Sequence, residues 1–205
     1  MSDSGSKLDP RIVRSKAALR DALLHLMSQR SFASISITDI VKQAKYNRGT
    51  FYANYANKEA LLDDVISELL KDLVQAFRAP YEHASSFHIS ELHANSVKIF
   101  EHVHKNAHLY SLLTRSDALP VLREKMFASL KDLVRHEFVH EDPDIDPELS
   151  AIYSNHALIG LLFHWIESGY VHPASYMQEQ LMKIVTRRPT RIKTAPNRNR
   201  EKPAP

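Results

Sequence analysis

The sequence lacks cysteine altogether and has only four glycines among 205 residues. Without cysteine it can form no disulfide, no thiolate metal site and no cysteine nucleophile, a composition that suits a reducing cytoplasm. So few glycines leave no glycine-rich phosphate loop and no dinucleotide-binding fingerprint, and the G-x-S-x-G nucleophile motif does not occur. We therefore expect that the protein is not an enzyme, with a scattered Ser/His/Asp site as the one catalytic arrangement left open.

Long hydrophobic runs are missing as well. No apolar stretch reaches the length of a membrane span, and the first residues are polar rather than signal-like. What is present is a hydrophobic content of 43%, which suffices for a buried core in a chain of this length. We expect a globular protein that is soluble and cytoplasmic, with no membrane partner and no cofactor.

The net charge of +3 is distributed unevenly along the chain. Residues 1–60 carry ten Lys/Arg against five Asp/Glu and residues 187–205 carry seven against one, whereas residues 61–186 carry ten against eighteen. A polyanion is therefore attracted to the amino-terminal part and to the tail rather than to the middle. Basic residues in either segment alone are more often part of an ordinary solvent-exposed surface than a binding site for a polyanion. A structural motif in the same segment is needed to favour binding.

Residues 36–62 contain such a motif. Four apolar residues at helical spacing predict one buried side of a short helix: Ile37, Ile40, Val41 and Ala44. A tight turn at residues 45–46 follows, and the Asn47 side chain can cap a second helix. Phe51 and Tyr55, four residues apart, direct the apolar side of that second helix back at the first. The pattern predicts a helix-turn-helix whose exposed side is small, hydroxylic and basic, which a DNA major groove admits.

These residues closely resemble the DNA-binding segment of the TetR family of bacterial transcriptional regulators. The resemblance rests on the run Ile37-Thr38-Asp39-Ile40-Val41-x-x-Ala44, followed by Arg48-Gly49-Thr50-Phe51-Tyr52-x-x-Tyr55-x-Asn57-Lys58-Glu59-x-Leu61-Leu62. It implies an all-α fold with an N-terminal three-helix helix-turn-helix domain and a larger helical C-terminal domain for ligand binding and dimerisation. One position departs from the family pattern, because Lys45 stands where the family usually has a turn glycine. A positive φ costs a residue with a side chain roughly 1 kcal/mol or more, so we expect strain or a rebuilt turn there.

The candidate DNA-binding residues lie in and around the second helix. We assign Arg48, Thr50 and Asn54 to bases or their flanking phosphates. Asn47 caps the helix and Gly49 allows a close approach to DNA. The resemblance further implies that Tyr52 and Lys58 touch the DNA backbone. Thr38, in the first helix, is the last candidate DNA-binding residue.

The rest of the chain predicts further helices. Residues 10–29 would roof the helix-turn-helix, and a helix that begins after Asn57 and ends at Pro80 would act as a lever between two domains. Other helical patterns cover about residues 90–105, 109–113, 119–140, 147–168 and 173–188. The expected organisation is a disordered N-terminus at 1–9, a helix-turn-helix domain at 10–56, a connecting helix at 57–79, a helical regulatory and dimerisation domain at 80–186, and a basic disordered tail at 187–205.

The helix expected at residues 147–168 is apolar nearly all round, so it needs cover from its own core and from a second surface. In a chain of this size, a second copy of the protein is the expected cover. Gly169 ends this helix in a left-handed conformation and Pro173 starts the last one; the two helices resemble the dimer-forming pair of the family. A homodimer predicts an inverted-repeat operator in double-stranded DNA, with half-sites on the order of 34 to 36 Å or a somewhat longer related spacing apart.

The resemblance also implies a small-molecule effector of unspecified chemistry in the second domain. The aromatic residues that could line its pocket are Phe100, Tyr110, Phe127, Tyr153 and Trp165, although each is more often ordinary core. Among the twelve histidines, His104 with His108 and His136 with His140 stand four residues apart, a spacing that can place two imidazoles on one metal ion. No third ligand is identifiable, and chance pairs in a histidine-rich chain explain the spacing as well.

The sequence thus predicts a sequence-specific DNA-binding transcriptional regulator. By the family pattern it is a repressor that binds a palindromic operator as a homodimer and is released by an effector. One alternative is a non-sensing architectural DNA-binding protein, which would bind all duplexes with nearly equal affinity. The other is a metal-responsive regulator that uses the histidines of the second domain.

Overall fold

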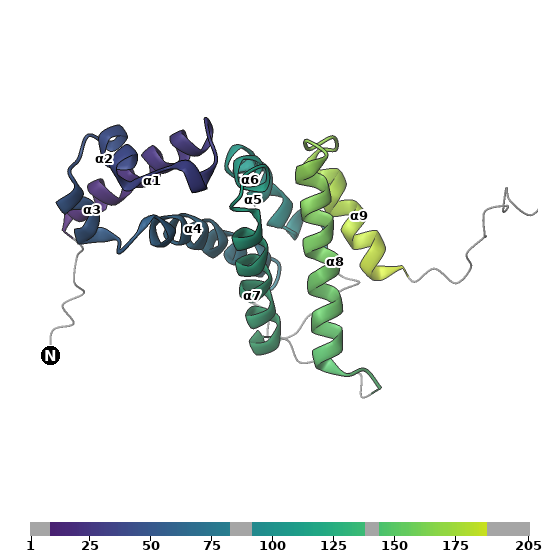
Figure 1. The fold of residues 1–205 in the computed structure, drawn as a ribbon. Helices are drawn as coiled ribbons and strands as arrows, with labels where there is room; N and C mark the ends of the chain where they lie inside the picture. Colours follow the sequence, from purple (N-terminus) through teal and green to yellow (C-terminus); the bar gives the residue numbers. More distant parts are fainter. Residues whose placement is uncertain (1–8, 83–91, 138–143, 188–205) are drawn as a thin grey trace, which may run out of the picture.

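The computed structural model describes residues 9–82, 92–137 and 144–187, and all regular structure in these ranges is helical. The helices are α1 (Pro10–Met27), η1 (Phe32–Ser34), α2 (Ile37–Ala44), α3 (Arg48–Asn54), α4 (Lys58–Arg78), η3 (Ala94–Ser96), α5 (Ile99–Lys105), α6 (Ala107–Thr114), α7 (Leu119–Glu137), α8 (Pro147–Glu167) and α9 (Ala174–Thr186), where η1 and η3 are short 3₁₀ helices (Figure 1). Within the described ranges, none of these helices combines the length and apolar character that crossing a bilayer requires. The all-α fold expected from the sequence is confirmed.

Helices α1 to α3 and the start of α4 form a small N-terminal unit. Helix α1 packs on α2, α3 and α4, and α2 packs on α3. Each helix start has a local cause: the side chains of Asp9, Asn47 and Asn57 accept hydrogen bonds from backbone N–H groups in the first turns of α1, α3 and α4. The core of the unit consists of fully buried apolar side chains: Leu19, Leu23, Ile40, Phe51 and Leu61. This core fixes α3 at one end of the molecule, to the left in Figure 1.

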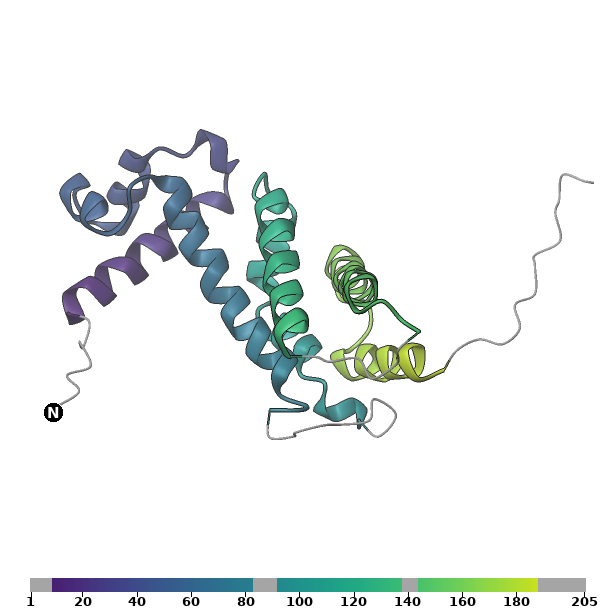
Figure 2. The same cartoon turned by 90° about the horizontal axis from the view of Figure 1, so that it is seen from below.

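Helix α4 leaves the N-terminal unit and reaches the second domain, where it packs against α5 and α7 (Figure 2). Helix α7 packs in turn against α8, and α5 packs against α9. Asp146 caps α8 by accepting bonds from the N–H groups of Glu148 and Leu149 at 2.8 and 3.0 Å. Gly169 has the expected left-handed backbone, and Tyr170 beside it has a positive φ of 60° as well. The helix predicted after Pro173 begins at Ala174.

One helix in the second domain differs from the prediction. A single helix was expected at about residues 90–105, but α5 begins only at Ile99, after the 3₁₀ turn η3. Residues 83–91 lie outside the described part of the chain, as do residues 138–140 at the predicted end of α7. The later start of α5 has a local reason in η3. The N–H groups of Ser96 and Val97 donate to the carbonyls of His93 and Ala94, three residues earlier. An i to i+3 pattern of this kind interrupts an α-helix.

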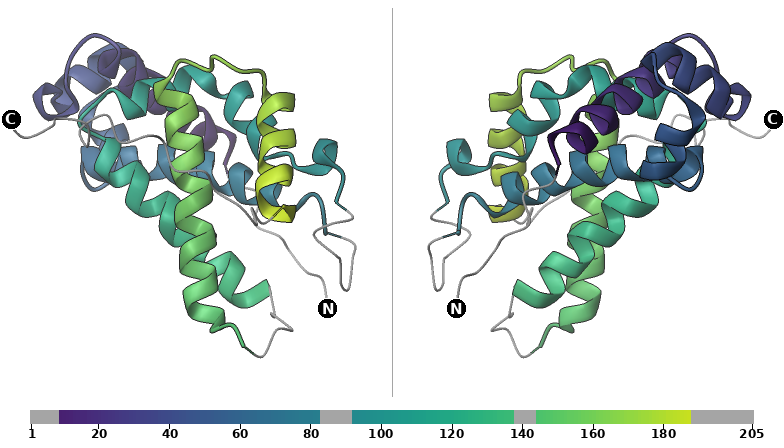
Figure 3. Two further views of the ribbon diagram at one scale, coloured as in Figure 1. Left: turned by 90° about the vertical axis from the view of Figure 1, so that its right-hand side faces the viewer. Right: turned by 90° about the vertical axis from the view of Figure 1, so that its left-hand side faces the viewer.

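The outer faces of α8 and α9 lie at the end of the molecule away from α3 (Figures 1 and 3). Apolar side chains stand in the open there: Tyr153 is 76% exposed, Leu149 66%, Ile184 63% and Val185 48%. Gly160 lies on the same outer side of α8, and no atom lies within 4 Å of the place its Cβ would occupy. Apolar residues from different sides of α8, among them Leu158, Ile159 and Phe163, are buried within this chain. In the described part of α8, the large apolar side chains left exposed are Leu149 and Tyr153, so the prediction of a second apolar side holds only near the start of the helix.

Candidate nucleic-acid interface

The first helix of the helix-turn-helix begins with a reciprocal cap. The Ser36 hydroxyl accepts a bond from the Asp39 N–H at 3.2 Å, and Asp39 Oδ2 accepts bonds from the Ser36 N–H at 2.9 Å and the Ser36 hydroxyl at 2.7 Å. These bonds from Ser36, with Arg30 at 3.0 Å as a further donor, lower the pKa of Asp39 to about 2. Asp39 therefore stays ionised under ordinary conditions and holds the start of α2 in place.

The turn between α2 and α3 passes through Lys45, whose backbone is left-handed at φ 59° and ψ 35°. This is the position at which the sequence departs from the family glycine, and the turn has kept its shape rather than being rebuilt. The N–H groups of Lys45 and Tyr46 close the turn by donating to the carbonyls of Lys42 and Val41. Of the two possibilities that the sequence left open, a strained turn or a rebuilt one, the structure shows the strained turn.

Helix α3 presents several of the predicted residues to solvent. Arg48, Gly49 and Tyr52 are exposed and Thr50 is half-buried, while Thr38 is exposed on the neighbouring α2. The Asn47 side chain accepts bonds from the N–H of Thr50 at 2.8 Å and from its hydroxyl at 3.2 Å. A Cβ at Gly49 would stand 3.2 Å from that capping oxygen, so glycine also keeps room for the cap.

The same surface contains residues that the sequence reasoning missed. Lys42, Gln43 and Tyr46 are exposed at the end of α2 and in the turn, beside the start of α3. The signal was available for Lys42 and Gln43, because they are the polar positions between the buried Val41 and the half-buried Ala44. We call the exposed set the α2–α3 face: Thr38, Lys42, Gln43, Tyr46, Arg48, Gly49 and Tyr52.

Asn54 does not belong to this face. Its side-chain amide donates to the Thr50 carbonyl at 2.8 Å and to the Ser15 hydroxyl of α1 at 3.2 Å, in a partly buried position. Since Ser15 is itself buried, Asn54 points into the junction between α1 and α3. The assignment of Asn54 to DNA bases is therefore corrected, and the residue holds α3 against α1.

Lys58 is also placed differently from the expectation of a phosphate anchor. Its ammonium donates to three backbone carbonyls, those of Phe32 at 2.9 Å, Ala33 at 3.0 Å and Ile35 at 2.8 Å. It also lies 4.6 Å from the centre of the Phe32 ring. All three N–H donors of the ammonium bind carbonyls of this chain, so the assignment of Lys58 to the DNA backbone is corrected.

A charged cluster behind the α2–α3 face fixes the angle between α1, α3 and α4. Asp64 of α4 accepts bonds from Arg20 Nε at 2.8 Å and from the Tyr55 hydroxyl at 2.5 Å. Burial acts to raise the pKa of Asp64, but the bonds from Tyr55 and Arg20 outweigh it, and the pKa is lowered. Burial and then the bond to Asp64 raise the pKa of Tyr55, so its hydroxyl remains a donor. The cluster holds α1, α3 and α4 together and is not part of the α2–α3 face.

The aromatic residues proposed for an effector pocket do not share one site. Phe100, Tyr110 and Trp165 are at most 1% exposed, and the Phe100 and Trp165 rings pack edge to face with centroids 5.6 Å apart. The Phe127 ring packs on His156, with centroids 4.4 Å apart. Tyr153 is 76% exposed, so its assignment to an internal pocket is corrected, because it stands on the outer side of α8.

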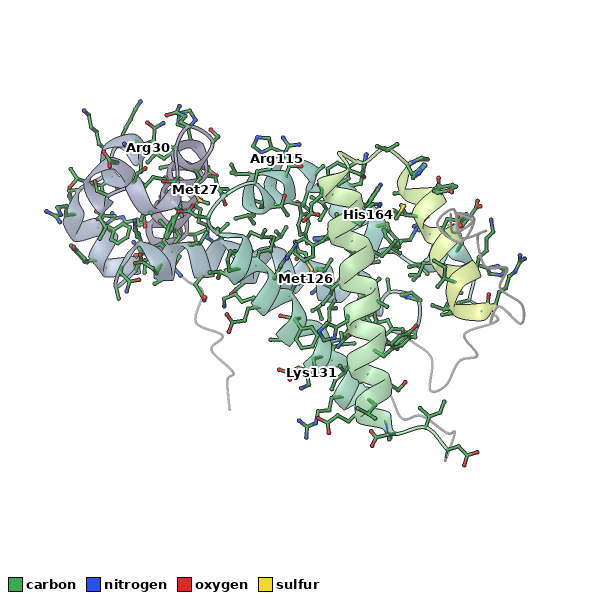
Figure 4. The ribbon with its side chains drawn as sticks, turned by 45° about the vertical axis from the view of Figure 1, so that its right-hand side comes forward. Met27, Arg30, Arg115, Met126, Lys131 and His164 are labelled. Atoms are coloured by element: carbon green, nitrogen blue, oxygen red, sulfur yellow. The ribbon has the colours of Figure 1, made fainter. Side chains whose placement is uncertain are left out.

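Two grooves lie elsewhere on the described surface, and none of those five aromatic residues lines either. One, of about 480 Å³, runs between α4 and α7 and is lined by Lys71, Arg78 and Lys125 among others. The other, of about 700 Å³, separates the end of α1 from α6 and the α6–α7 turn. Arg30 and Arg115 stand on the two sides of this second groove, which we call the joint groove (Figure 4). The joint groove lies between the N-terminal unit and the second domain.

Of the two histidine pairs, the structure describes the side chains of His104 and His108 only. α5 ends at Lys105 and α6 begins at Ala107, so His104 and His108 do not lie on one continuous helix, and His104 stacks on Trp165. Within the described ranges, no group of three His, Asp or Glu side chains is arranged to hold a metal. The His136 side chain and all of His140 lie outside those ranges. His136, Glu137 and His140 also match the pattern H-E-x-x-H of zinc proteases, which the expectation that the protein is not an enzyme did not take into account.

Comparison with known families assigns both parts of the chain. The family model described as "Bacterial regulatory proteins, tetR family" matches residues 19–65. The model described as "Transcriptional regulator C-terminal region" matches residues 90–187. The first match contains the helix-turn-helix, and the second contains η3 and α5 to α9.

Individual relatives agree with these matches. The chain is 27% identical over 182 residues to the HTH-type transcriptional regulator YxbF of Bacillus subtilis, covering 87% of this chain and 46% of YxbF. It is 24% identical over 169 residues to YhgD, another HTH-type regulator of B. subtilis, covering 73% of this chain and 83% of YhgD. The chain therefore spans less than half the length of YxbF but most of YhgD. A putative TetR-family regulator from Syntrophomonas wolfei has the same fold, with a TM-score of 0.64 at 15% identity over 85% of this chain and 94% of that one.

Proposed function

The chain belongs to the TetR family of bacterial transcriptional regulators, and from that premise we propose that it binds an inverted-repeat DNA operator as a homodimer in the cytoplasm. Members of this family are regulators rather than enzymes, and they bind DNA. The operator, the dimer interface and the direction of regulation are our proposals. The α2–α3 face is the observation that supports DNA binding.

The α2–α3 face has the composition that DNA binding requires. Arg48 stands at the first position of α3, where an arginine can reach guanine edges or the phosphates beside them. Lys42 and Lys45 add positive charge on the same side, and Tyr46 and Tyr52 expose 40% and 52% of their surface. Phosphate contacts from such residues position a recognition helix, and base contacts select the sequence. We assign Arg48 to base recognition and Tyr52 to the DNA backbone.

The exposed apolar side of α8 and α9 supports dimerisation. Leu149 and Tyr153 of α8 and Ile184 and Val185 of α9 are exposed apolar side chains, which a second copy of the chain would cover. A twofold axis through this surface would place two α3 helices on the same side of a duplex. The bound dimer would repress by occupying the operator, and an effector that changes the tilt of α4 would release it.

The DNA proposal is tested by selecting bound fragments from the host genome and titrating the selected site by gel shift. We expect enrichment of a short palindrome, whereas an architectural protein would enrich no sequence. Arg48→Ala should weaken specific binding by about 1 to 3 kcal/mol. Arg135→Ala, which removes an exposed arginine of α7, is the matched control and should leave affinity unchanged. Equal affinity of the Arg48→Ala protein and the wild type would reject the assignment of the α2–α3 face.

The dimer proposal is tested by sedimentation at micromolar concentration. Tyr153→Glu places a charge on the outer side of α8 and should convert the dimer to a monomer. Tyr46→Glu changes an exposed tyrosine in the other domain, so it should stay dimeric while losing DNA. If the wild type sediments as a monomer, the inverted-repeat operator has no basis.

A further inference from the structure

The 3₁₀ turn η1 is bound by a carboxylate from the second domain. Asp117 Oδ1 accepts a hydrogen bond from the Phe32 N–H at 2.8 Å, and Asp117 Oδ2 accepts one from the Ala33 N–H at 2.9 Å. The bonded residues are 85 and 84 positions apart in the sequence. One side chain of the α6–α7 turn therefore binds the first two N–H groups of η1, an arrangement we call the Asp117 clamp.

Asp117 is held on a firm part of the second domain. The next residue, Ala118, is 1% exposed and belongs to the main hydrophobic core. The Ser116 hydroxyl accepts a bond from the Ala118 N–H at 3.2 Å, and the Ser116 carbonyl accepts one from the Leu119 N–H at 3.3 Å. A displacement of the α6–α7 turn is therefore passed to the carboxylate rather than absorbed by a loose loop.

The other side of the clamp leads directly to the DNA-binding helices. Ile35, which follows η1, is 1% exposed in the core of the N-terminal unit, and the next residue, Ser36, caps α2. Lys58 of α4 meanwhile binds the carbonyls of η1, so both hydrogen-bonding ends of this turn are occupied. Moving η1 would move the start of α2 and, through the packing of α2 on α3, the recognition helix.

The clamp crosses a joint that is otherwise open on this side. The joint groove, of about 700 Å³, separates Arg30 and Ser31 from Arg115 around the clamp (Figure 4). Burial acts to raise the pKa of Asp117, but the N–H groups of Ala33 and Phe32 together outweigh it, and the pKa is lowered. The carboxylate is thus charged at neutral pH, the state in which its bonds to N–H groups are strongest.

We propose that Asp117 is a positioning residue for DNA binding, through which the second domain sets the placement of the helix-turn-helix. This inference rests on the proposed function, since it assigns a regulatory role to the link between the two domains. The residue touches no DNA itself and acts through η1. Breaking the clamp lets the helix-turn-helix take positions that do not match the spacing of two half-sites.

Amide hydrogen exchange measured by NMR tests the clamp directly. In Asp117→Ala, the Phe32 and Ala33 amides should exchange roughly 10- to 100-fold faster, as expected from the loss of hydrogen bonds to a charged group. Glu167→Ala is the matched control, because it removes a carboxylate that pairs with Arg123 at 3.1 Å within the second domain. The control should leave both amides unchanged. Unchanged exchange in Asp117→Ala would overturn the clamp, whatever the protein binds.

Operator binding tests the positioning role. At a temperature where all variants are fully folded, Asp117→Ala should raise the operator Kd about tenfold and Glu167→Ala less than twofold. Asp117→Asn keeps one acceptor oxygen and should recover part of the loss. A lower melting temperature with an unchanged Kd would show a merely structural contact and overturn the proposal. If the wild type selects no DNA sequence, the proposed function fails and the positioning role fails with it, while the exchange experiment still decides whether the clamp forms.

Discussion

Lys58 offers the sharpest test, because the family resemblance implies that it contacts DNA whereas the structure shows its ammonium bound to backbone carbonyls. In Lys58→Met the stem keeps its packing on Phe32, but three carbonyls lose their donor, two of them in partly buried positions. A hydrogen bond to a charged group contributes about 1.5 to 3 kcal/mol, and bonds that share one ammonium do not add in full. We therefore expect a loss of about 3 kcal/mol, which lowers the melting temperature by roughly 6 to 12 °C in a chain of this size.

The assay compares thermal unfolding with the salt dependence of DNA binding. Lys42→Met is the matched control, since it removes an exposed lysine from the α2–α3 face. It should leave the melting temperature nearly unchanged and lower the slope of log K against log salt by about one unit for each half-site of the operator. Lys58→Met should do the reverse. If Lys58→Met melts like the wild type and lowers the slope, the ammonium binds phosphate after all and our reasoning from the carbonyl contacts is wrong.

Three further changes probe the N-terminal unit. Lys45→Gly removes a left-handed side-chain residue that costs about 1 to 2 kcal/mol, against which the freer unfolded chain returns about 0.4 to 1 kcal/mol; we expect a melting temperature a few degrees higher, and an unchanged or lower one would refute the strain. Because the folded-state pKa of Asp64 is lowered, its contribution to stability is present above an unfolded pKa of about 3.9 and is lost as pH falls through the folded value. Melting curves from pH 6 to 3 should thus fall less steeply for Asp64→Asn than for the wild type, and parallel curves would count against the cluster. Asn54→Ala should lower stability and leave the selected DNA sequence unaltered, as fragment selection would show.

The features that the sequence predicted well are local ones. The Asn47 cap depends on a side chain and an N–H group within three residues, so the residue type and its position sufficed. The family resemblance located the turn at Lys45, and the positive φ there is one of the two outcomes that the sequence left open.

The features that were missed depend on partners far away in the chain. Lys58 binds carbonyls 23 to 26 residues earlier, Asn54 binds Ser15 across 39 residues, and Asp117 binds η1 across 84 and 85. No periodicity contains these distances, so a polar side chain on a predicted surface was assigned to DNA or to solvent. Tyr153 was assigned to a pocket for a similar reason, since an aromatic residue in an apolar helix has the same letter whether it faces inward or outward.

The length of α4 has a geometric consequence. Its 21 residues form an unbroken helix, and at 1.5 Å per residue the rod is about 32 Å long. Pivoting such a rod by about 5° carries its far end through about 3 Å, close to the 3.4 Å rise of one base-pair step along a DNA strand. A small rotation of α4 at the second domain is thus enough to shift the DNA-binding helices by about one base pair.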